Sequence, residues 1–424
     1  MGGIAVIPET IFDGSWIADA SERARYLAAF KGEQDRLNGV ESSMRTTGLV
    51  ISEAEPVLFC AKLFAGLAYD FPVWLKASSL LPGDERRFAE ILDQGAARPS
   101  ALYVATGGTS GSLRFACHTW PGLLAAVCNL QGRVGDNPLR SWCCLPLRHV
   151  GGLMQVFRAI LSEGNVVFGE YRDLLKRDFP RNLIEDRFVS LVPTQLARLL
   201  ASPSAVAHLR SAVAVFVGGG PLDSSIALAA RQAKLPVAPT YGTTETAGMV
   251  TLLSPEHFLS GRDGAGSALP GNDLDFDEGV LRIRSSSLCL GYHDRDFENG
   301  SWFQTADVGF WDEDGSLRIE GRMDRLINTG GVKVDPAKIE RVILDTGMVE
   351  KCFVTGVPDS EWGRRLVAFC EPASTNPEDI NHALRNQLSG ASLPKLLVAV
   401  DRLPLDEMGK PDSRAISIAL DGAC

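Results

Sequence analysis

The sequence predicts an α/β protein with a large N-terminal domain and a small, mobile C-terminal α+β domain. We expect the large domain to hold mixed, mostly parallel sheets flanked by helices, plus a small β-rich subdomain. Short apolar runs typical of strands alternate with helical segments between residues 101 and 234, and strands joined by Asp-Gly and Asn-Gly turns follow from about residue 275. Alternating strands and helices are typical of parallel sheets, whereas tight turns are typical of antiparallel ones.

The alternation identifies the expected elements one by one. Residues 1–100 are expected to form mainly helices and loops, with a helix at 21–37 where apolar residues recur at helical spacing. Beyond them, each short apolar run is followed by a helical pattern. The expected strands lie at 101–105, 141–147, 165–170, 188–193 and 212–219, and the helices that follow them at 119–130, 152–164, 173–178, 194–202 and 224–234.

The last part of the chain predicts a second domain. Residues 279–292 and 316–321 indicate antiparallel strands. After Asp324 an α/β pattern returns over about 100 residues, which is enough for a small domain. We therefore expect an N-terminal nucleotide- and acyl-binding domain at 1–323 and a mobile lid domain at 324–424.

Composition excludes several classes of protein. The net charge of −10 gives no support for nucleic-acid binding, and no apolar run is long enough for a membrane span. Nine cysteines, an odd number without a C-x-x-C pair, argue against a disulfide scaffold and a zinc site. No basic, apolar leader opens the sequence, so we expect a cytoplasmic protein with reduced thiols.

A glycine- and hydroxyl-rich segment between a strand and a helix is the first candidate site. It contains Thr106, Thr109 and Ser110, and Arg114 follows. Backbone N–H groups of such a loop can converge on phosphate oxygens, and Arg114 can add a cation. A flexible loop without a ligand is the alternative, and the absence of a following Gly-Lys pair excludes a Walker A loop.

The second candidate places an aromatic ring, a glycine, hydroxyls and a carboxylate together. Tyr241 and Gly242 precede Thr244 and Glu245. Tyr241 can stack on a base, Thr244 can contact a phosphate and Glu245 can ligate Mg²⁺. The alternative is a turn with a solvated glutamate.

Two further candidates lie near the C-terminal domain. Asp307 follows a strand pattern and suits the two hydroxyls of a ribose, while a plain turn residue is the alternative. Gly330 and Gly331 permit a positive φ or a close backbone approach. Lys410 lies on a glycine-containing loop, where it is either a mobile point charge for a site or a surface lysine.

Together these segments resemble the acyl-adenylate-forming superfamily of acyl-CoA synthetases, luciferases and adenylation domains. The resemblance covers residues from about 100 to the end, in the family's order. Arg114 stands where the family has lysine, and Ala306 where it has glycine. The matching segments are 106–114, 240–245, 305–309, 321–340 and 403–410.

The resemblance implies an AMP-forming acid–CoA ligase that uses ATP, Mg²⁺ and coenzyme A. It implies catalytic roles for Lys410, Arg114, Thr244 and His149, a metal ligand in Glu245 and a hinge at Asp324. The implied nucleotide and coenzyme contacts are Thr106, Thr109, Ser110, Gly218, Gly219, Gly220, Tyr241, Gly242, Asp307, Arg322, Gly330 and Gly331.

Residues 145–164 and 190–200 resemble the o-succinylbenzoate–CoA ligases of menaquinone biosynthesis. This resemblance implies that His149 lines the acyl pocket and that Arg198 is a candidate for a second substrate carboxylate. The alternatives are a hydrogen-bonded core histidine and a solvated helix position. Another aryl- or acyl-CoA ligase, or a non-catalytic nucleotide-binding relative, stays open as the function, and a homo-oligomer is possible.

Overall fold

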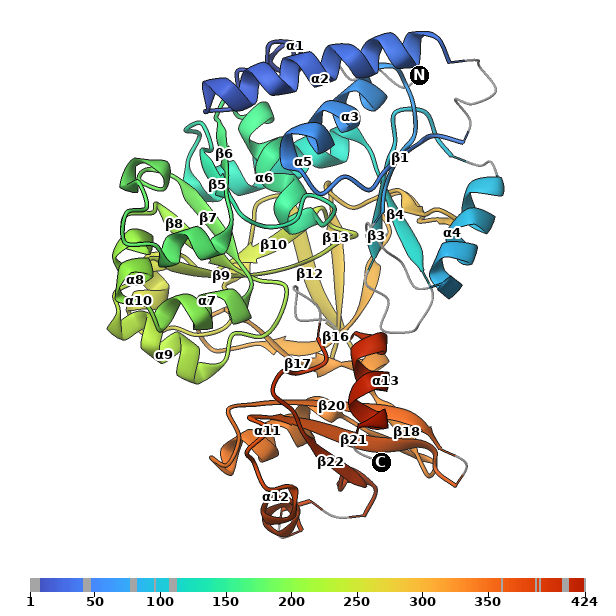
Figure 1. Ribbon diagram of the computed structural model, residues 1–424, viewed down its shortest axis with the longest axis vertical. Helices are drawn as coiled ribbons and strands as arrows, with labels where there is room; N and C mark the ends of the chain where they lie inside the picture. The colour runs from blue at the N-terminus through green and yellow to red at the C-terminus, as the bar shows by residue number, and fades with distance from the viewer. Residues whose placement is uncertain are drawn as a thin grey trace. The chain divides into compact units, whose positions relative to one another are not determined.

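The computed structural model describes residues 8–40, 47–76, 82–94, 97–106, 113–359, 361–385, 387–388, 390–405 and 412–422. The chain separates into two compact units (Figure 1). The first consists of Met1–Asp277, Arg282–Thr305 and Phe310–Arg318, and the second of Glu278–Leu281, Ala306–Gly309 and Ile319–Cys424. The predicted α/β class is confirmed, while the domain boundary at Asp324 stays a prediction.

The first unit contains ten α-helices within the described ranges and two short 3₁₀-helices. Several begin with proline in the first turn, where its missing N–H costs nothing. The α-helices are α1 (Thr10–Asp13), α2 (Ala20–Asn38), α3 (Pro56–Ala68), α4 (Pro82–Asp93), α5 (Trp120–Val134), α6 (Val150–Leu161), α7 (Pro193–Leu200), α8 (Pro203–Leu209), α9 (Ser224–Gln232) and α10 (Pro255–Leu259); the 3₁₀-helices are η2 (Tyr171–Leu175) and η3 (Arg181–Leu183).

A seven-stranded sheet forms the centre of this unit, in the order β11-β10-β9-β8-β7-β5-β6. The strands β5 to β9 pair in parallel, whereas β9, β10 and β11 pair antiparallel. The strands are β5 (Ser141–Cys143), β6 (Val166–Phe168), β7 (Phe188–Leu191), β8 (Ala214–Val217), β9 (Val237–Thr243), β10 (Gly248–Leu252) and β11 (Ser267–Ala268).

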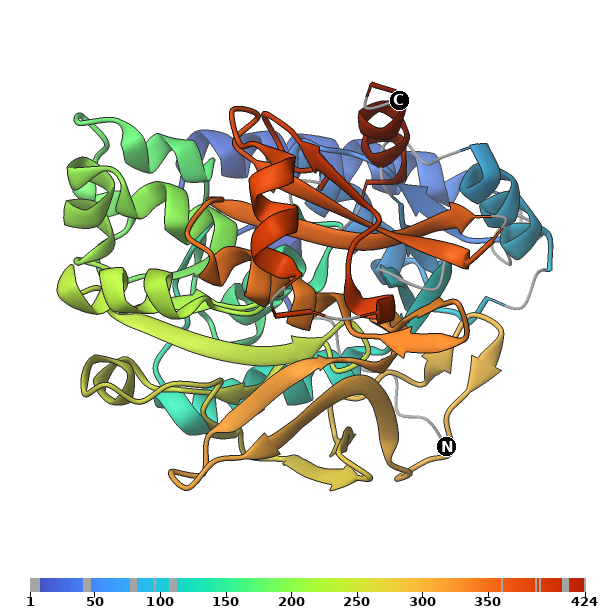
Figure 2. The ribbon, with the colours of Figure 1, turned by 90° about the horizontal axis from the view of Figure 1, so that it is seen from below.

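The side chains of β8 point alternately into two separate hydrophobic cores. Ala214 and Phe216 belong to one core, with α2, α3, α5 and α6, and Val215 and Val217 belong to another, with α7 to α10. Successive side chains of a strand point to opposite faces, so the sheet is covered by helices on both sides. The helices α7, α8 and α9 form the green group in Figures 1 and 2.

A second sheet of the first unit has the order β1-β2-β3-β4-β14-β15. The strands β1 to β3 pair in parallel, and β3, β4, β14 and β15 pair antiparallel. Its strands are β1 (Leu49–Ile51), β2 (Val73–Leu75), β3 (Leu102–Thr106), β4 (Arg114–His118), β14 (Gly291–Tyr292) and β15 (Arg295–Asp296).

The remaining strands form smaller sheets. A four-stranded sheet has the order β12-β13-β16-β17, and the second unit holds the pair β18-β19 and the sheet β20-β21-β22. The strands are β12 (Asn272–Asp277), β13 (Val280–Ser285), β16 (Phe303–Trp311), β17 (Leu317–Arg322), β18 (Ile327–Thr329), β19 (Val332–Val334), β20 (Lys351–Asp359), β21 (Gly363–Glu371) and β22 (Leu396–Ala399). The second unit also has α11 (Pro336–Asp345), α12 (Pro377–Leu384), α13 (Ser413–Asp421) and two 3₁₀ turns, η4 (Met323–Arg325) and η5 (Gly390–Ser392).

Three expectations need correction. Residues 1–100 contain the strands β1 and β2 besides helices. The helix expected at 173–178 is a 3₁₀ turn at Tyr171–Leu175. The strand expected at 279–292 is two strands in different sheets, β13 and β14, because β14 pairs with β4 instead of continuing beside β12. Within the described ranges, no helix combines the length and apolarity that crossing a membrane requires.

Candidate functional site

The three glycines after β8 lie at the carboxyl end of the parallel strands. A Cβ at Gly218 would lie 3.1 Å from the Thr240 carbonyl oxygen, and Gly219 has φ +80°. Ligands of open α/β sheets bind beyond the carboxyl ends of the strands. The predicted adenine loop, Gly218 to Gly220, therefore occupies the expected edge; a side chain would be crowded at Gly218 and strained at Gly219.

The predicted aromatic motif lies on the neighbouring β9–β10 hairpin. Tyr241 pairs with Thr251, whose hydroxyl oxygen accepts the Tyr241 N–H at 3.3 Å. A Cβ at Gly242 would come within 2.0 Å of the Gly248 carbonyl oxygen. Gly242 thus permits the two strands to approach and sets the position of Tyr241 beside it.

The turn that carries Thr244 and Glu245 is held by hydrogen bonds. The hydroxyl of Thr246, which is fully buried, accepts the Thr243 N–H at 3.0 Å and donates to the Gly248 carbonyl at 2.7 Å. The Ser287 hydroxyl donates to the Thr246 carbonyl at 2.9 Å, and the Cys289 N–H donates to the Glu245 carbonyl at 2.7 Å. These bonds fix the backbone on which both predicted side chains stand.

His118 also supports this turn, and the sequence analysis missed it. Its Nε2 lies 2.9 Å from the Thr244 carbonyl oxygen, so Nε2 donates the proton. Burial lowers the pKa of His118 to about 4, and its Nδ1 has no partner among the described residues. The neutral imidazole therefore orients Thr244 at physiological pH. No signal in the sequence distinguishes His118 from an ordinary buried strand residue.

Glu245 and Arg114 are brought together by Tyr292, a second residue that the sequence analysis missed. The Tyr292 hydroxyl donates to Glu245 Oε1 at 2.9 Å, and the Arg114 guanidinium lies 5.5 Å from the Tyr292 ring centroid. Burial and the Glu245 charge raise the pKa of Tyr292. The pairing of Tyr292 with Ala116 on β4 places it there. The sequence offers one indication of such a position, because Tyr292 stands at the end of an apolar run, where strand-end residues often border a site.

The strands β3 and β4 frame the predicted phosphate loop. Thr106 pairs with Arg114, and its hydroxyl donates to the Arg114 carbonyl at 3.5 Å. Thr109 and Ser110 lie outside the described residues. The two ends of the loop therefore lie next to each other, and the Arg114 side chain extends from the second end to the Tyr292 ring.

The structure places His149 and Arg198 on different helices. His149 is the N-cap of α6, and its carbonyl accepts the Leu153 N–H at 2.9 Å. Arg198 is exposed on α7 and donates from Nη1 to the Tyr171 hydroxyl at 2.9 Å. The predicted substrate role of Arg198 thus concerns a solvated side chain that already has a hydrogen-bond partner.

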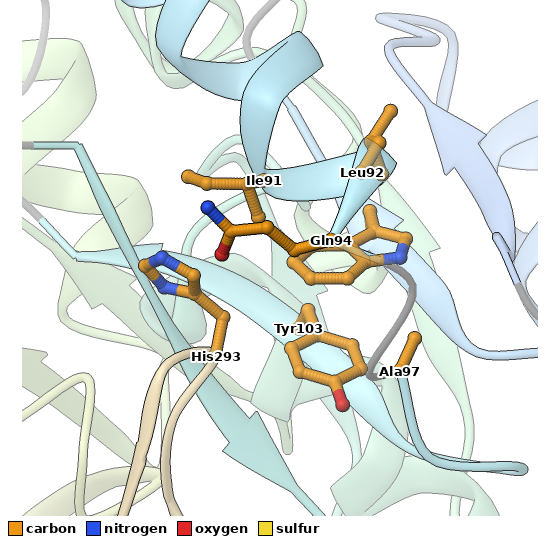
Figure 3. A pocket seen from close by; sticks show the side chains of 7 residues that line it. Ile91, Leu92, Gln94, Ala97, Tyr103 and His293 are labelled. Atoms are coloured by element: carbon orange, nitrogen blue, oxygen red, sulfur yellow. The ribbon is translucent and has the colours of Figure 1, made fainter.

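The described residues of the first unit also line a small hollow, with room for about 20 Å³ of solvent, and none of the predicted site residues lines it. Trp74 and Tyr103 stack at 3.9 Å along it, and the polar ends of Gln94 and His293 face each other across it (Figure 3). Its remaining lining residues, Ile91, Leu92 and Ala97, are apolar. We attribute no part of the chemistry to this hollow.

In the second unit, Asp307 and Arg322 form an ion pair between β16 and β17. Arg322 Nη1 lies 3.0 Å from Asp307 Oδ1, and Asp307 is 4% exposed. The two residues predicted to hold a ribose are therefore neighbours. Asp324, the predicted hinge, lies in the short turn η4, and Lys410 lies outside the described residues.

Gly330 and Gly331 form the two-residue turn of the β18–β19 hairpin. Their φ values are +58° and +82°, as a type I′ turn requires. The Gly330 N–H donates to the Trp362 carbonyl at 3.0 Å, and a Cβ at Gly330 would lie 2.8 Å from the Trp362 ring. This turn is consequently docked against Trp362.

Comparison with known proteins identifies relatives along most of the chain. The family described as "AMP-binding enzyme" matches residues 67–293, and "AMP-binding enzyme C-terminal domain" matches residues 338–410. A 2-succinylbenzoate–CoA ligase of Listeria monocytogenes is 30% identical over 323 residues, which cover 73% of this chain and 68% of that protein. A 2-succinylbenzoate–CoA ligase of Bacillus licheniformis is 27% identical over 330 residues, covering 73% of this chain and 68% of that protein.

Solved structures share the fold. The o-succinylbenzoate CoA synthetase of Bacillus subtilis, in complex with its acyl-adenylate intermediate, superposes with a TM-score of 0.74 at 22% identity and covers 93% of this chain and 92% of that chain. The same enzyme with ATP and magnesium ion gives a TM-score of 0.72 at 21% identity, covering 92% of this chain and 93% of that chain.

Proposed function

This chain belongs to the AMP-binding enzyme family, and we propose that it is an ATP-dependent acid–CoA ligase that activates o-succinylbenzoate. The observation that carries the proposal is the Glu245–Tyr292–Arg114 cluster beside a glycine-lined sheet edge, in a chain that is 30% identical to a 2-succinylbenzoate–CoA ligase. In this proposal, the Glu245 carboxylate serves the metal and the Arg114 cation serves the phosphates of the nucleotide.

The first half-reaction makes a mixed anhydride. A substrate carboxylate oxygen attacks the α-phosphorus of ATP, the bond from that phosphorus to the bridging oxygen breaks, and pyrophosphate leaves. Anions must approach one another, so catalysis rests on positioning and on preorganised positive groups. In the first unit, we assign this stabilisation of negative charge to Arg114 and to the backbone N–H groups of residues 106–112.

The nucleotide's base and phosphates have proposed contacts in the first unit. Gly218 to Gly220 leave room for the adenine, and Tyr241 packs against it. Thr244, held by His118 through its carbonyl, contacts the α-phosphate. In the second unit, Asp307 accepts hydrogen bonds from the ribose, and Arg322 fixes the Asp307 carboxylate.

The described residues fit a magnesium ion that is shared with a nucleotide. Protein sites for Mg²⁺ commonly use one or two carboxylates together with substrate phosphates. Glu245 is such a single carboxylate, with one oxygen on Tyr292, and no group of three or more metal-binding side chains occurs in the described ranges. When bound, Mg²⁺ offsets the charge of the phosphates.

The second half-reaction transfers the acyl group to coenzyme A. The thiol sulfur attacks the carbonyl carbon, the C–O bond to AMP breaks, and the thiol proton passes to solvent. We assign Lys410 to the first half-reaction and the Gly330–Gly331 turn to the pantetheine channel of the second.

The eight cysteines that the structure describes are unpaired, which fits a reducing cytoplasm.

The test is ATP–pyrophosphate exchange with a panel of aryl and acyl acids, followed by addition of coenzyme A. We expect exchange with o-succinylbenzoate, dependent on Mg²⁺, and formation of its CoA thioester. Chelation by EDTA should abolish exchange, and excess Mg²⁺ should restore it.

Exchange with a different acid alone would reject o-succinylbenzoate and keep the ligase. Nucleotide binding without exchange for any acid would favour a non-catalytic relative. Exchange without thioester formation would reject coenzyme A as the acceptor.

A further inference from the structure

His293 makes two hydrogen bonds to a single residue of β4, at the edge of the candidate site. Its backbone N–H donates to the Phe115 carbonyl at 2.9 Å, and its ring Nδ1 accepts the Phe115 N–H at 3.3 Å. In a regular antiparallel pair, two opposed residues exchange both bonds through their backbones. The imidazole therefore takes the place of a backbone carbonyl where the pairing of β14 with β4 ends.

The same two strands carry the candidate site on their opposite face. Successive side chains of a strand point to opposite sides of the sheet. Arg114 and Tyr292 lie on the side of Glu245, which the Tyr292 hydroxyl contacts at 2.9 Å. Phe115 and His293 lie on the other side, where their rings meet edge to face at a centroid distance of 6.2 Å. The bonds between them thus join the backbone directly behind the site.

Phe115 is a rigid point of attachment. Its ring is completely buried, and its centroid lies 5.3 Å from those of Trp74 and Phe88. Because Nδ1 accepts a hydrogen bond, the ring hydrogen of His293 lies on Nε2, which faces Gln94 across the hollow of Figure 3. Burial lowers the pKa of His293, so the imidazole is neutral and able to accept at physiological pH.

The strand that carries Tyr292 has little pairing of its own. β14 is two residues long, and Tyr292 with Ala116 is its register pair with β4. An ion pair between Arg98 and Asp296 also ties the β14–β15 hairpin down, but both side chains are exposed, and exposed ion pairs contribute little. The bond to the imidazole is therefore important for the position of the hairpin.

We propose that His293 is a positioning residue for the binding of ATP and magnesium. By accepting the Phe115 N–H, its imidazole keeps the backbone of Tyr292 and Arg114 in register. This inference rests on the proposed function, because it takes Glu245 as the magnesium ligand and Arg114 as a phosphate contact. It deepens that function by adding a support that touches neither the metal nor the nucleotide. Supports of this kind set the orientation and the affinity of the groups that do.

The test compares two nearly isosteric replacements. His293→Asn places an amide oxygen where Nδ1 lies, whereas His293→Leu places a methyl group there and leaves the Phe115 N–H without its acceptor. Titration calorimetry with ATP and Mg²⁺ should give a Kd raised by about 10-fold for His293→Leu and within about twofold of wild type for His293→Asn. In ATP–pyrophosphate exchange, His293→Leu should raise the KM for ATP by a similar factor and change the KM for the acid by less than about twofold.

Asp296→Asn is the matched control, because it removes the exposed ion pair with Arg98 from the same hairpin. It should leave the affinity for ATP and Mg²⁺ unchanged. Thermal melts establish that each variant is folded. If His293→Leu is not, His293→Gln carries the comparison, because its amide lies one bond beyond the position of Nδ1.

Wild-type affinity in His293→Leu, or in His293→Gln where it stands in, would make His293 structural only and overturn the inference, whatever the melting temperature. Equal weakening in His293→Asn or in Asp296→Asn would overturn it as well, since the acceptor atom would not be the cause. A wild-type protein that binds ATP but exchanges with no acid would reject the proposed function and leave the calorimetric comparison valid. A wild-type protein that binds no ATP would reject both.

Discussion

Two residues outside every expected motif hold the candidate site in place. Tyr292 links Glu245 to Arg114, and His118 fixes the carbonyl of Thr244. Both lie far from residues 240–245 in sequence and reach them through the strands β14 and β4. Support of this kind orients a metal ligand and shapes its affinity.

Tyr292→Phe tests this support at a single atom. It removes the hydroxyl that donates to Glu245 and keeps the ring near Arg114 and Phe297. We expect the apparent affinity for Mg²⁺ in ATP–pyrophosphate exchange to fall by about 10-fold, because hydrogen-bond partners of metal ligands commonly contribute this much to metal affinity. Magnesium titrations of exchange activity measure it.

The control is Tyr103→Phe, which also removes one tyrosine hydroxyl in the first unit, where it accepts the Arg98 N–H. It should leave the magnesium dependence unchanged. An unaltered magnesium titration for Tyr292→Phe would show that the Tyr292 hydroxyl does not support magnesium binding.

At the scale of elements, two hairpins each depend on glycine at a specific place. Gly242 permits β9 and β10 to approach, and the pair Gly330 and Gly331 turns β18 into β19. The sequence predicted a positive φ or a close backbone approach at the glycine pair, and the positive φ values are present. The contact of Gly330 with Trp362 was not predicted, because 32 positions separate the two residues and β21 brings them together.

Gly330→Ala and Gly331→Ala form a matched pair. Each introduces a side chain at positive φ, which costs roughly 1 kcal/mol. Only Gly330→Ala also drives a Cβ into the Trp362 ring, so it should destabilise the second unit by about 1–3 kcal/mol more. Hydrogen exchange of peptides from residues 320–372 measures the difference; equal protection in both variants would contradict the docking of this turn.

The helices and strands themselves were largely predictable. Alternating apolar runs located β5 to β8 and the helices α5, α6, α7 and α9, because each buries a regular face. The short strands β1 and β2 were missed, because three residues are too few to show an alternation of apolar and polar side chains. The run 279–292 was misassigned because periodicity does not reveal which sheet a strand joins.

At the scale of the whole molecule, the chain consists of two units that each have their own core. We propose that the second unit contributes different residues to the two half-reactions. Lys410 belongs to the first half-reaction, and the Gly330–Gly331 turn belongs to the second. Rotation at Asp324 between the two steps stays a prediction, as does the boundary there. A single-residue hinge is physically ordinary.

Lys410→Ala tests this division of work. We expect acyl-AMP formation to fall by about 10²- to 10³-fold, since a positive group is lost from the transition state. Transfer from supplied acyl-AMP to coenzyme A should stay within about threefold, because the proposed role of Lys410 is confined to the first half-reaction. Single-turnover assays of each half-reaction measure both.

The matched control is Lys395→Ala, which removes a lysine of the same unit that lies 4.4 Å from the Trp362 ring centroid. It should leave adenylation unchanged. A similar loss of both half-reactions in Lys410→Ala would reject the assignment of this lysine to one step.

The sequence by itself determined the α/β class, the order of the motifs and the residue types of a nucleotide site, because periodicity and turn chemistry are local. Only the tertiary structure decided which distant residues support those motifs. Strand pairing brings Tyr292 and His118 to the turn that carries Thr244 and Glu245. Helix packing leaves Arg158 as a buried cation and Arg198 as a solvated one. Burial depends on contacts between segments far apart in the chain, so no local pattern could have distinguished the two arginines.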